Sequence, residues 1–412
     1  MFRWIKQFWN KAGPGIITGA SDDDPSGIAT YSQAGAAFGL KFLWTAWITY
    51  PLMYAIQEMS ARIGIVNQTG LFGVISKHYH SFWSWFTLIL IVPAILFNIA
   101  ADLASMGAIL HILLPAIPAV VLTLLIVLIS MGYTFFCRYE TVTSIFKVFC
   151  LALFCYFIVP FLVKQNWSEI LYASFIPQME WSKEYLLLLV AILGTTISPY
   201  LFFWQSSLSN EDSKKNNSSN KTDIKWMKLD VSLGMFASNL AMYFIILTTA
   251  TVLHAHGVLK IQTVEEAAKA LEPLAGKLAF IAFAVGVLGV GFLAIPVLAG
   301  CIGYMCAEFF HWESGLDKTP KQAPAFYTII GASLFIALAI NLIGIDPIES
   351  LVLTAVLYGL ITPPIVLIIL LISNNKKIMG PHVNSPFINL LGVLTFLLMT
   401  AASLAFLIFE FI

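Results

Sequence analysis

Apolar runs of membrane-spanning length recur throughout this chain of 412 residues. A helix needs about 20 mainly apolar residues to cross the hydrocarbon core of a bilayer. Hydrophobic residues make up 59% of the chain and charged residues only 11%, whereas soluble domains carry about 25% charge. The sequence therefore predicts an all-α integral membrane protein with about eleven transmembrane helices. We expect them at 14–38, 40–65, 83–112, 117–137, 144–163, 184–208, 228–253, 276–309, 323–343, 348–372 and 387–410.

The first of these runs is interrupted by three consecutive carboxylates, Asp22 to Asp24. A charge at bilayer depth costs roughly 2.5 to 3.5 kcal/mol on insertion scales, so an intramembrane aspartate is by default a functional candidate. Pro25 has no amide hydrogen and Gly27 disfavours helix, so we expect the chain to unwind near the third carboxylate. The alternative is that the first span begins after the acidic run, but residues 28–40 alone are too short to cross a bilayer.

A second interruption lies in the span at 184–208, where residues 194–199 read Gly-Thr-Thr-Ile-Ser-Pro. The second interruption lies five spans after the first, and an odd offset turns the second half through the membrane in the opposite direction. This is the pattern of an inverted repeat with its site between two broken helices. We therefore predict one transmembrane domain over 1–412, built as a 5+5 inverted repeat plus one helix. Its parts are a first repeat at 12–165, an inverted second repeat at 184–373 and an extra helix at 387–411.

The basic residues predict the orientation. Most of the 22 lysines and arginines fall on one side if the amino terminus is cytoplasmic, as the positive-inside rule requires. We therefore expect an integral protein of a bacterial inner (plasma) membrane with a cytoplasmic amino terminus. The polar stretch 209–220 should then be a mobile cytoplasmic loop. Net charge is zero and there is no basic tail, which gives no indication of a nucleic-acid partner; the expected partner is the lipid bilayer.

Oxygen atoms dominate both interruptions. Asp24, together with carbonyl groups freed by the breaks, would make a site for a hard cation. Neutral oxygen donors lie in the second interruption: Thr195, Thr196, Ser198 and Tyr200. Neither break contains Cys, His or Met, so the pattern favours Mg²⁺ or Mn²⁺ over copper or zinc.

Other intramembrane charges have more than one interpretation. Asp102 in the third span could bind a proton, pair with a cation or line the pathway, or it could be protonated and hydrogen-bonded to a neighbouring helix. Asp22 and Asp23 would attract cations near the first break. Glu58 and Arg62 are four residues apart and predict an ion pair along one helix.

With these motifs in view, the chain resembles the Nramp family of divalent metal transporters over nearly its whole length. The matching stretches are Gly13-Pro14-Gly15 leading to Asp24-Pro25-Ser26-Gly27, Gln57 with Ala61-Arg62-Ile63-Gly64, Asp102-Leu103-Ala104, and Gly194 to Pro199. The resemblance implies a LeuT-like fold, alternating access and uptake of a divalent transition metal, usually coupled to protons.

The resemblance also implies which residues bind the metal, and some of them are replaced here. The family's aspartate ligand carries over as Asp24, but its asparagine ligand is lost at Gly27. The family's Met-Pro-His becomes Ser198, proline and Tyr200, so the thioether and the imidazole are both absent. The alanine that offers its carbonyl matches Thr195, a backbone role that any residue can fill.

Two further departures bear on ion choice and coupling. The family's aspartate in the third span carries over as Asp102, but its nearby glutamate becomes Ser105, which places proton coupling in question. A soft thioether helps the family to discriminate against Mg²⁺. Its replacement by Ser198 resembles the Nramp-related magnesium transporter branch, where a wider site suits an ion that sheds its water reluctantly.

The sequence thus predicts a secondary transporter that imports divalent cations of the Mn²⁺/Mg²⁺ class. Asp24 would be the main ligand, with the Thr195 carbonyl and Ser198 assisting and with Gly27 and Tyr200 lining the site. The divalent ion is a substrate, and we expect no permanently bound cofactor.

Three alternatives remain at this stage. The first is a proton-coupled Mn²⁺/Fe²⁺ symporter of the ordinary Nramp type. The second, an amino-acid carrier on the same fold, would need a broken first helix free of carboxylates, which 22–24 oppose. The third, an intramembrane aspartyl protease, would pair Asp24 with Asp102, but its Gly-x-Gly-Asp pattern occurs at neither residue, so we do not expect an enzyme.

Overall fold

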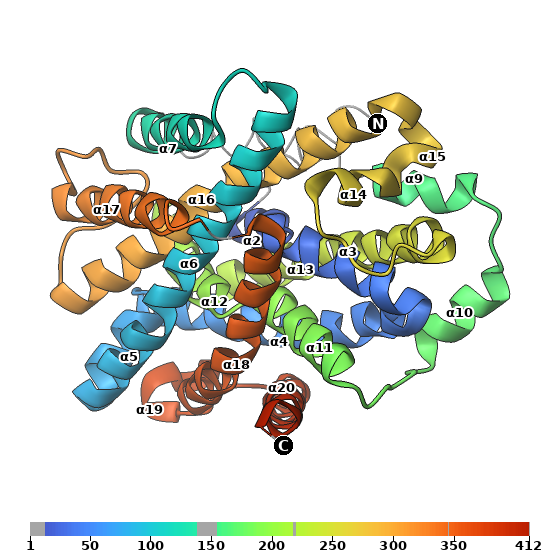
Figure 1. Ribbon diagram of the computed structural model, residues 1–412. Helices are drawn as coiled ribbons and strands as arrows, with labels where there is room; N and C mark the ends of the chain where they lie inside the picture. Colours follow the sequence, from blue (N-terminus) through green and yellow to red (C-terminus); the bar gives the residue numbers. More distant parts are fainter. Residues whose placement is uncertain (1–12, 138–154, 217–219, 345, 412) are drawn as a thin grey trace, which may run out of the picture.

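The fold is entirely helical wherever the computed structural model describes the chain, at residues 13–137, 155–216, 220–344 and 346–411 (Figure 1). No strand occurs in these ranges. The α-helices are α2 (Pro14–Asp22), α3 (Pro25–Phe38), α4 (Leu43–Asn67), α5 (Leu71–His78), α6 (Ser81–Leu113), α7 (Ala119–Phe136), α9 (Cys155–Leu162), α10 (Trp167–Phe175), α11 (Lys183–Thr196), α12 (Pro199–Asn216), α13 (Asn220–Val252), α14 (Val264–Ala268), α15 (Glu272–Ala275), α16 (Ala279–Phe310), α17 (Pro324–Asn341), α18 (Pro347–Ser373), α19 (Lys376–Met379) and α20 (Pro386–Phe411).

Eight helical stretches in the described part of the chain are long and apolar enough to cross a membrane. They are α6, α7, the joined α11 and α12, α13, α16, α17, α18 and α20. The interrupted first span appears as α2 and α3, and the second expected span as α4. The expected span at 144–163 lies mostly outside the described residues, which include only its end as α9.

The first helix breaks where the sequence predicts. Helix α2 ends at Asp22, and α3 begins at Pro25. Between them Asp24 is extended, with φ −66° and ψ 174°, and its carboxylate accepts the amide hydrogen of Gly27 as an N-cap. Because proline at the first helical position lacks a hydrogen that would be unpaired there in any case, the Asp-Pro pair starts a new helix.

The second break also lies at the predicted proline. Helix α11 ends at Thr196, Ile197 leaves helical geometry, and α12 begins at Pro199. The hydroxyl of Thr362 on α18 donates to the freed carbonyl of Ile197 at 3.3 Å. A neighbouring helix thus satisfies a backbone group that the break exposes, as the bilayer interior requires.

The predicted loop at 209–220 is wrong over most of its length, because α12 continues to Asn216. Contacts with distant residues hold this polar end of α12 in place. Tyr304 of α16 donates to Glu211 at 2.7 Å, and Lys215 pairs with Asp317 at 2.6 Å. Composition alone does not reveal these partners, which lie about 90 to 100 residues away.

Helix α2 packs on α13 through glycines. A Cβ at Gly15 would lie 2.5 Å from the amide nitrogen of Val231, and a Cβ at Gly19 or Gly234 would overlap backbone of the opposite helix. Small residues permit this approach, as is common between membrane helices. Asp230 of α13 also accepts the amide hydrogen of Gly15 at 2.5 Å and so caps the start of α2.

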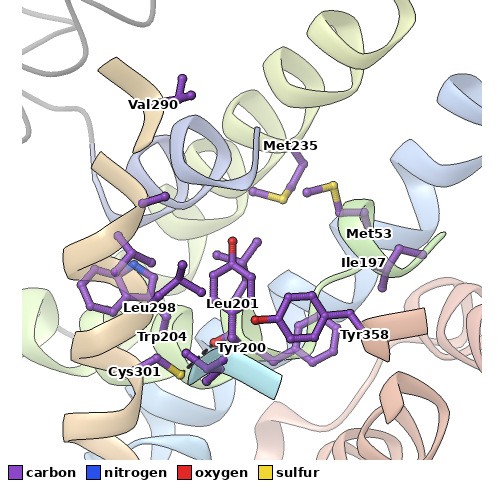
Figure 2. Packing of buried hydrophobic residues seen from close by; sticks show 14 of the residues in the cluster. Met53, Ile197, Tyr200, Leu201, Trp204, Met235, Val290, Leu298, Cys301 and Tyr358 are labelled. Atoms are coloured by element: carbon purple, nitrogen blue, oxygen red, sulfur yellow. Dashed lines mark hydrogen bonds between the residues drawn. The ribbon is translucent and has the colours of Figure 1, made fainter. Parts of the chain in front are cut away.

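Aromatic residues fill the centre beside the second break (Figure 2). The rings of Tyr200 and Tyr358 lie 5.5 Å apart, joining α12 to α18. On the α16 side, the thiol of Cys301 donates to the carbonyl of Tyr200 at 3.3 Å, and Trp204 is fully buried nearby. The start of α12 is therefore held from two sides.

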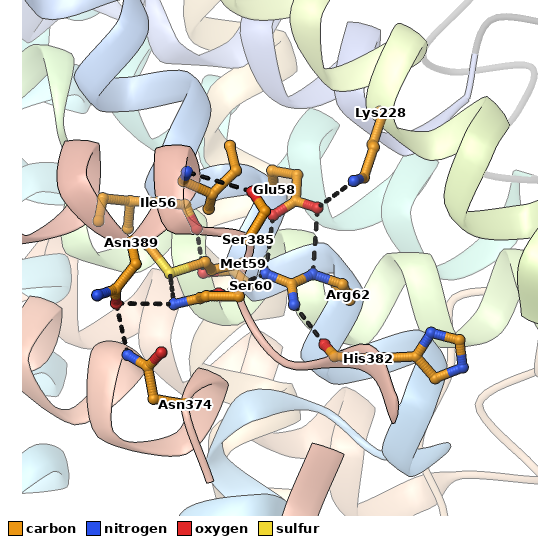
Figure 3. Close-up of polar contacts among 12 residues, drawn as sticks. Ile56, Glu58, Met59, Ser60, Arg62, Lys228, Asn374, His382, Ser385 and Asn389 are labelled. Carbon is orange, nitrogen blue, oxygen red and sulfur yellow. Dashed lines mark hydrogen bonds and ion pairs between the residues drawn. The ribbon is translucent and has the colours of Figure 1, made fainter. Parts of the chain in front are cut away.

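A buried ion-pair network joins α4 to distant segments (Figure 3). Arg62 donates to Glu58 at 3.0 Å, which confirms the predicted pair. Lys228 of α13 lies 3.4 Å from the same carboxylate. Arg62 also donates to the carbonyl of His382 and, at 2.6 Å, to the side chain of Asn384. The network therefore ties α4 to α13 and to the segment before α20.

We expect Gly234→Ala to lower the free energy of unfolding by about 1 to 3 kcal/mol, because the added methyl group would overlap the backbone of α2. Thermal unfolding of the purified protein in detergent measures the change. Gly132→Ala is the matched control, since nothing lies within 4 Å of a Cβ there; alanine should keep or raise the stability of α7. Equal loss in both variants would show that the α2–α13 contact is not close.

Candidate metal centre

Asp24 lies at the break of the first helix with only 1% of its surface exposed. The hydroxyl of Ser26 and the amide of Gly27 donate to its Oδ1, at 2.7 Å and 2.9 Å. Both donors belong to the first turn of α3, so this oxygen is committed to capping the helix. Its Oδ2 accepts one hydrogen bond, at 3.2 Å from the side chain of Asn98. Oδ2 is therefore the atom of Asp24 that is available to a cation.

The two breaks lie against one another. A Cβ at Gly27 would stand 3.4 Å from both the hydroxyl oxygen of Thr195 and the carbonyl of Asp22. The hydroxyls of Tyr31 on α3 and Thr196 on α11 are 3.1 Å apart. The end of α11 thus meets the beginning of α3, and the structure places Thr195 beside the first break.

Tyr200 and Ser198 occupy different positions relative to that junction. Tyr200 donates to the carbonyl of Ser21 at 3.4 Å, so its hydroxyl reaches the last turn of α2. The hydroxyl of Ser198 instead donates to the carbonyls of Thr195 and Gly194, at 2.6 Å and 3.1 Å. Ser198 is bonded to the last turn of α11 and would have to rotate before its oxygen could face a metal near Asp24.

Asp102 is connected to the first break through a residue that the sequence reasoning missed. Asn98, also on α6, donates from its Nδ2 to Asp102 at 2.9 Å and to Asp24 at 3.2 Å. Asn98 and Asp102 are both fully buried. Their spacing of four residues places them on one helix face, and this is the signal that could have identified Asn98.

Asp22 and Asp23 turn toward α13. The hydroxyl of Ser238 lies 2.6 Å from an oxygen of Asp22 and 3.3 Å from one of Asp23. Both carboxylates are buried, and Ser238 was not recognised from the sequence. The two residues therefore lie beside the break and contact α13, whereas Asp24 contacts α6 through Asn98.

The buried carboxyl groups of this centre have no basic partner among the described residues. None of the ion pairs in the described part of the chain includes Asp22, Asp23, Asp24 or Asp102. A buried carboxylate is costly unless a cation, a proton or several hydrogen-bond donors compensate it. Within the same residues no three side chains of His, Cys, Asp or Glu gather as a metal-binding group. A cation here would therefore bind carboxylate together with neutral oxygen.

A small cavity of about 20 Å³ lies beside the first break. Pro25, which follows Asp24, forms part of its wall, as does Ser105 on α6. Its other end is lined by the segment around α14, including Ile261 and Val264. The walls are otherwise mainly apolar, and no charged residue lines them.

The sequence matches the family described as "Natural resistance-associated macrophage protein-like", Nramp, over residues 15–409. The chain belongs to the Nramp family. It is 28% identical over 397 residues to the divalent metal cation transporter MntH of Caldanaerobacter subterraneus, covering 95% of this chain and 90% of the relative. It is 27% identical over 401 residues to MntH of Clostridium acetobutylicum, covering 95% and 88%.

Solved structures support the same fold. The Eremococcus coleocola manganese transporter, crystallised with an aromatic bis-isothiourea compound, is 18% identical with a TM-score of 0.75, covering 98% of this chain and 87% of that one. Mhp1, a nucleobase-cation-symport-1 family transporter in a closed conformation, is 13% identical with a TM-score of 0.61, covering 96% and 92%. The expected all-α, LeuT-like class is thus confirmed.

These relatives bear on the alternatives as well. They are described as metal transporters and not as enzymes. The prediction that this Nramp chain is not an enzyme is therefore confirmed, and the aspartyl protease alternative has no support.

We expect Ser238→Ala to lower the free energy of unfolding by about 1 to 3 kcal/mol, because Asp22 and Asp23 lose their shared donor while they remain buried. Thermal unfolding measures the loss. Ser333→Ala is the control, since the buried hydroxyl of Ser333 donates only to a carbonyl of its own helix. A loss no larger than the control's would mean that Ser238 does not stabilise the two carboxylates.

Proposed function

We propose that this Nramp chain is a secondary transporter that imports divalent cations of the Mn²⁺/Mg²⁺ class by alternating access. The observation that carries the proposal is the position of Asp24, a buried carboxylate at one helix break that lies directly against a second break. Broken helices that meet near the bilayer midplane are where secondary transporters bind their ions.

The ligand set follows from the atoms at this junction. Oδ2 of Asp24 is the charged ligand, and the carbonyl of Thr195 and the rotated hydroxyl of Ser198 supply neutral oxygen. Gly27 and Tyr200 line the site. Asp22 and Asp23 act on the approaching ion at longer range, because their charges are not paired within the described residues.

The donor chemistry supports a hard cation. Carboxylate, carbonyl and hydroxyl oxygens suit Mg²⁺ and Mn²⁺, and the bacterial relatives are named for divalent metal and manganese. Loss of the thioether at Ser198 removes a ligand that disfavours Mg²⁺. We therefore infer that both ions are substrates, as in the magnesium branch that the sequence resembles.

Helix α4 packs closely on α12, where a Cβ at Gly64 would overlap the carbonyl of Ser206. The Glu58–Arg62 pair lies on the same helix α4. With the predicted cytoplasmic amino terminus, these contacts would close the cytoplasmic side of the carrier, and the ion would enter from outside.

We expect Asp24→Asn to abolish uptake of both ions, because the site loses its only charged ligand between the breaks. Mn²⁺ and Mg²⁺ entry into proteoliposomes measures transport, and the parent should take up both. Asp346→Asn is the control: this exposed aspartate caps α18, and asparagine caps a helix about as well. Full transport by Asp24→Asn would contradict the assigned site.

A second candidate is the proton-coupled symport of ordinary Nramp proteins. The observation in its favour is Asp102, which is buried and whose Oδ1 has no hydrogen-bond partner among the described residues. Against it, Ser105 stands where the family carries a second carboxylate, so only one of the two proton-binding groups remains.

A pH dye inside the same proteoliposomes distinguishes the two mechanisms. We expect Mg²⁺ and Mn²⁺ to enter without acidifying the lumen, since the glutamate of the proton path is replaced by Ser105. Acidification that accompanies Mn²⁺ entry and disappears in Asp102→Asn would instead support the proton-coupled mechanism. Protonophore-treated vesicles control for passive proton leak.

A further inference from the structure

Asn98 occupies an unusual position for an amide side chain. It lies fully buried on α6, and both of its bonds go to carboxylates, Asp24 at 3.2 Å and Asp102 at 2.9 Å. Both bonds are donated by the same nitrogen, Nδ2. The amide group of Asn98 thus lies between Asp24, the principal ligand of the proposed site, and Asp102 on α6.

The other end of this amide has no partner. Oδ1 of Asn98 is buried and accepts no hydrogen bond among the described residues, and Oδ1 of Asp102 is in the same condition. Unpaired buried oxygens are costly. They lie next to carboxylates whose charge no described basic residue balances. The group around Asn98 therefore has two oxygen atoms without a hydrogen-bond partner and no described basic residue.

A rotation of the Asn98 amide by about 180° around its terminal torsion would direct its oxygen toward the two carboxylates. The terminal torsion of asparagine is roughly two-fold, so the turn exchanges Oδ1 and Nδ2 without moving the backbone. Oδ1 would then stand about where Nδ2 is now, near 3.2 Å from an oxygen of Asp24 and 2.9 Å from one of Asp102.

These spacings fit a six-coordinate hard cation. In an octahedron with metal–oxygen bonds of 2.0 to 2.1 Å, adjacent ligand atoms are about 2.9 Å apart. Of the two separations at Asn98, the one to Asp102, 2.9 Å, equals that value, and the one to Asp24, 3.2 Å, is slightly longer. Three oxygens from Asp24, Asn98 and Asp102 could therefore occupy neighbouring corners around Mg²⁺ or Mn²⁺, leaving the remaining corners to carbonyls and water.

We infer that Asn98 is a ligand of the transported cation, bound through Oδ1 after its amide turns over, and that it binds together with Asp24 and Asp102. This inference rests on the proposed function, since it assigns a further residue to the same site. It also gives Asp102 a role as a ligand, and it moves the metal from the midpoint of the two breaks toward α6.

Asn98 as a ligand would replace the asparagine ligand that the family carries at the position of Gly27. Gly27 has no side chain to offer, and its Cβ position is bordered at 3.4 Å by Thr195, Asp22 and Tyr31. An amide oxygen from α6 restores the same chemical group from another helix. The donor set stays hard, with two carboxylates and one amide.

Two substitutions at this position separate a ligand from a structural donor. Asn98→Asp keeps an oxygen but cannot donate when ionised, and Asn98→Leu removes both functions at similar size. For a ligand, isothermal titration of Mg²⁺ and Mn²⁺ should give a Kd within about threefold of the parent for Asn98→Asp and at least about tenfold weaker for Asn98→Leu. Equal weakening in both variants, or no change in Asn98→Leu, overturns the inference.

An infrared measurement on the parent does not depend on how the variants fold. With ¹³C-labelled asparagine, adding Mg²⁺ to the purified protein should shift a side-chain carbonyl band, and the shifted band should be absent from Asn98→Asp. A difference spectrum without an asparagine carbonyl band overturns the inference. Thermal unfolding without metal shows whether each variant is folded before titration.

Asp24→Asn distinguishes this inference from the proposed function. If the parent binds divalent cations, Asp24→Asn does not, and Asn98→Leu binds like the parent, then the ligand assignment of Asn98 fails and the transporter site stands. If Asp24→Asn binds and transports like the parent, the proposed function fails and the role of Asn98 fails with it.

Discussion

Burial of carboxylates without basic partners is the constraint on which the rest of this structure depends. Asp24 finds hydrogen-bond donors at this depth because the helix stops beside it: the first turn of α3 directs a hydroxyl and an amide toward one of its oxygens. A continuous helix would offer no such donors, since its amides are already bonded. The break therefore stabilises the carboxylate, and it leaves the second oxygen with a single donor, the amide of Asn98.

Close helix packing is what keeps such a break in place. Glycines bring α2 onto α13, where Asp230 caps the free start of α2. On the other side of the junction, Thr362 satisfies the carbonyl freed at Ile197. Because no water is available in a bilayer core, the unpaired backbone N–H and C=O groups at each break need a protein partner. Residues far from the ion thus determine whether the ion site exists.

Local chemistry was readable from the sequence, and contacts between distant residues were not. The breaks at Pro25 and Pro199 follow from backbone geometry within a few residues, so they were predicted correctly. Asn98 was missed because its partner Asp24 lies 74 positions away, and the hydroxyl of Ser238 lies 216 positions from Asp22. A polar residue in an apolar helix signals only that some partner exists.

The donor set explains why exchange of soft ligands need not weaken the centre. A thioether contributes selectivity by binding soft ions more strongly than hard ones, while Coulomb attraction from carboxylates acts on any divalent ion. The centre around Asp24 keeps the attraction from carboxylates. Asp22 and Asp23 add to it, because they are buried next to Asp24 and form no ion pair among the described residues. In the site that we propose, discrimination between divalent ions would therefore come from size and hydration, which depend on how closely oxygens from α3, α6 and α11 can approach one ion.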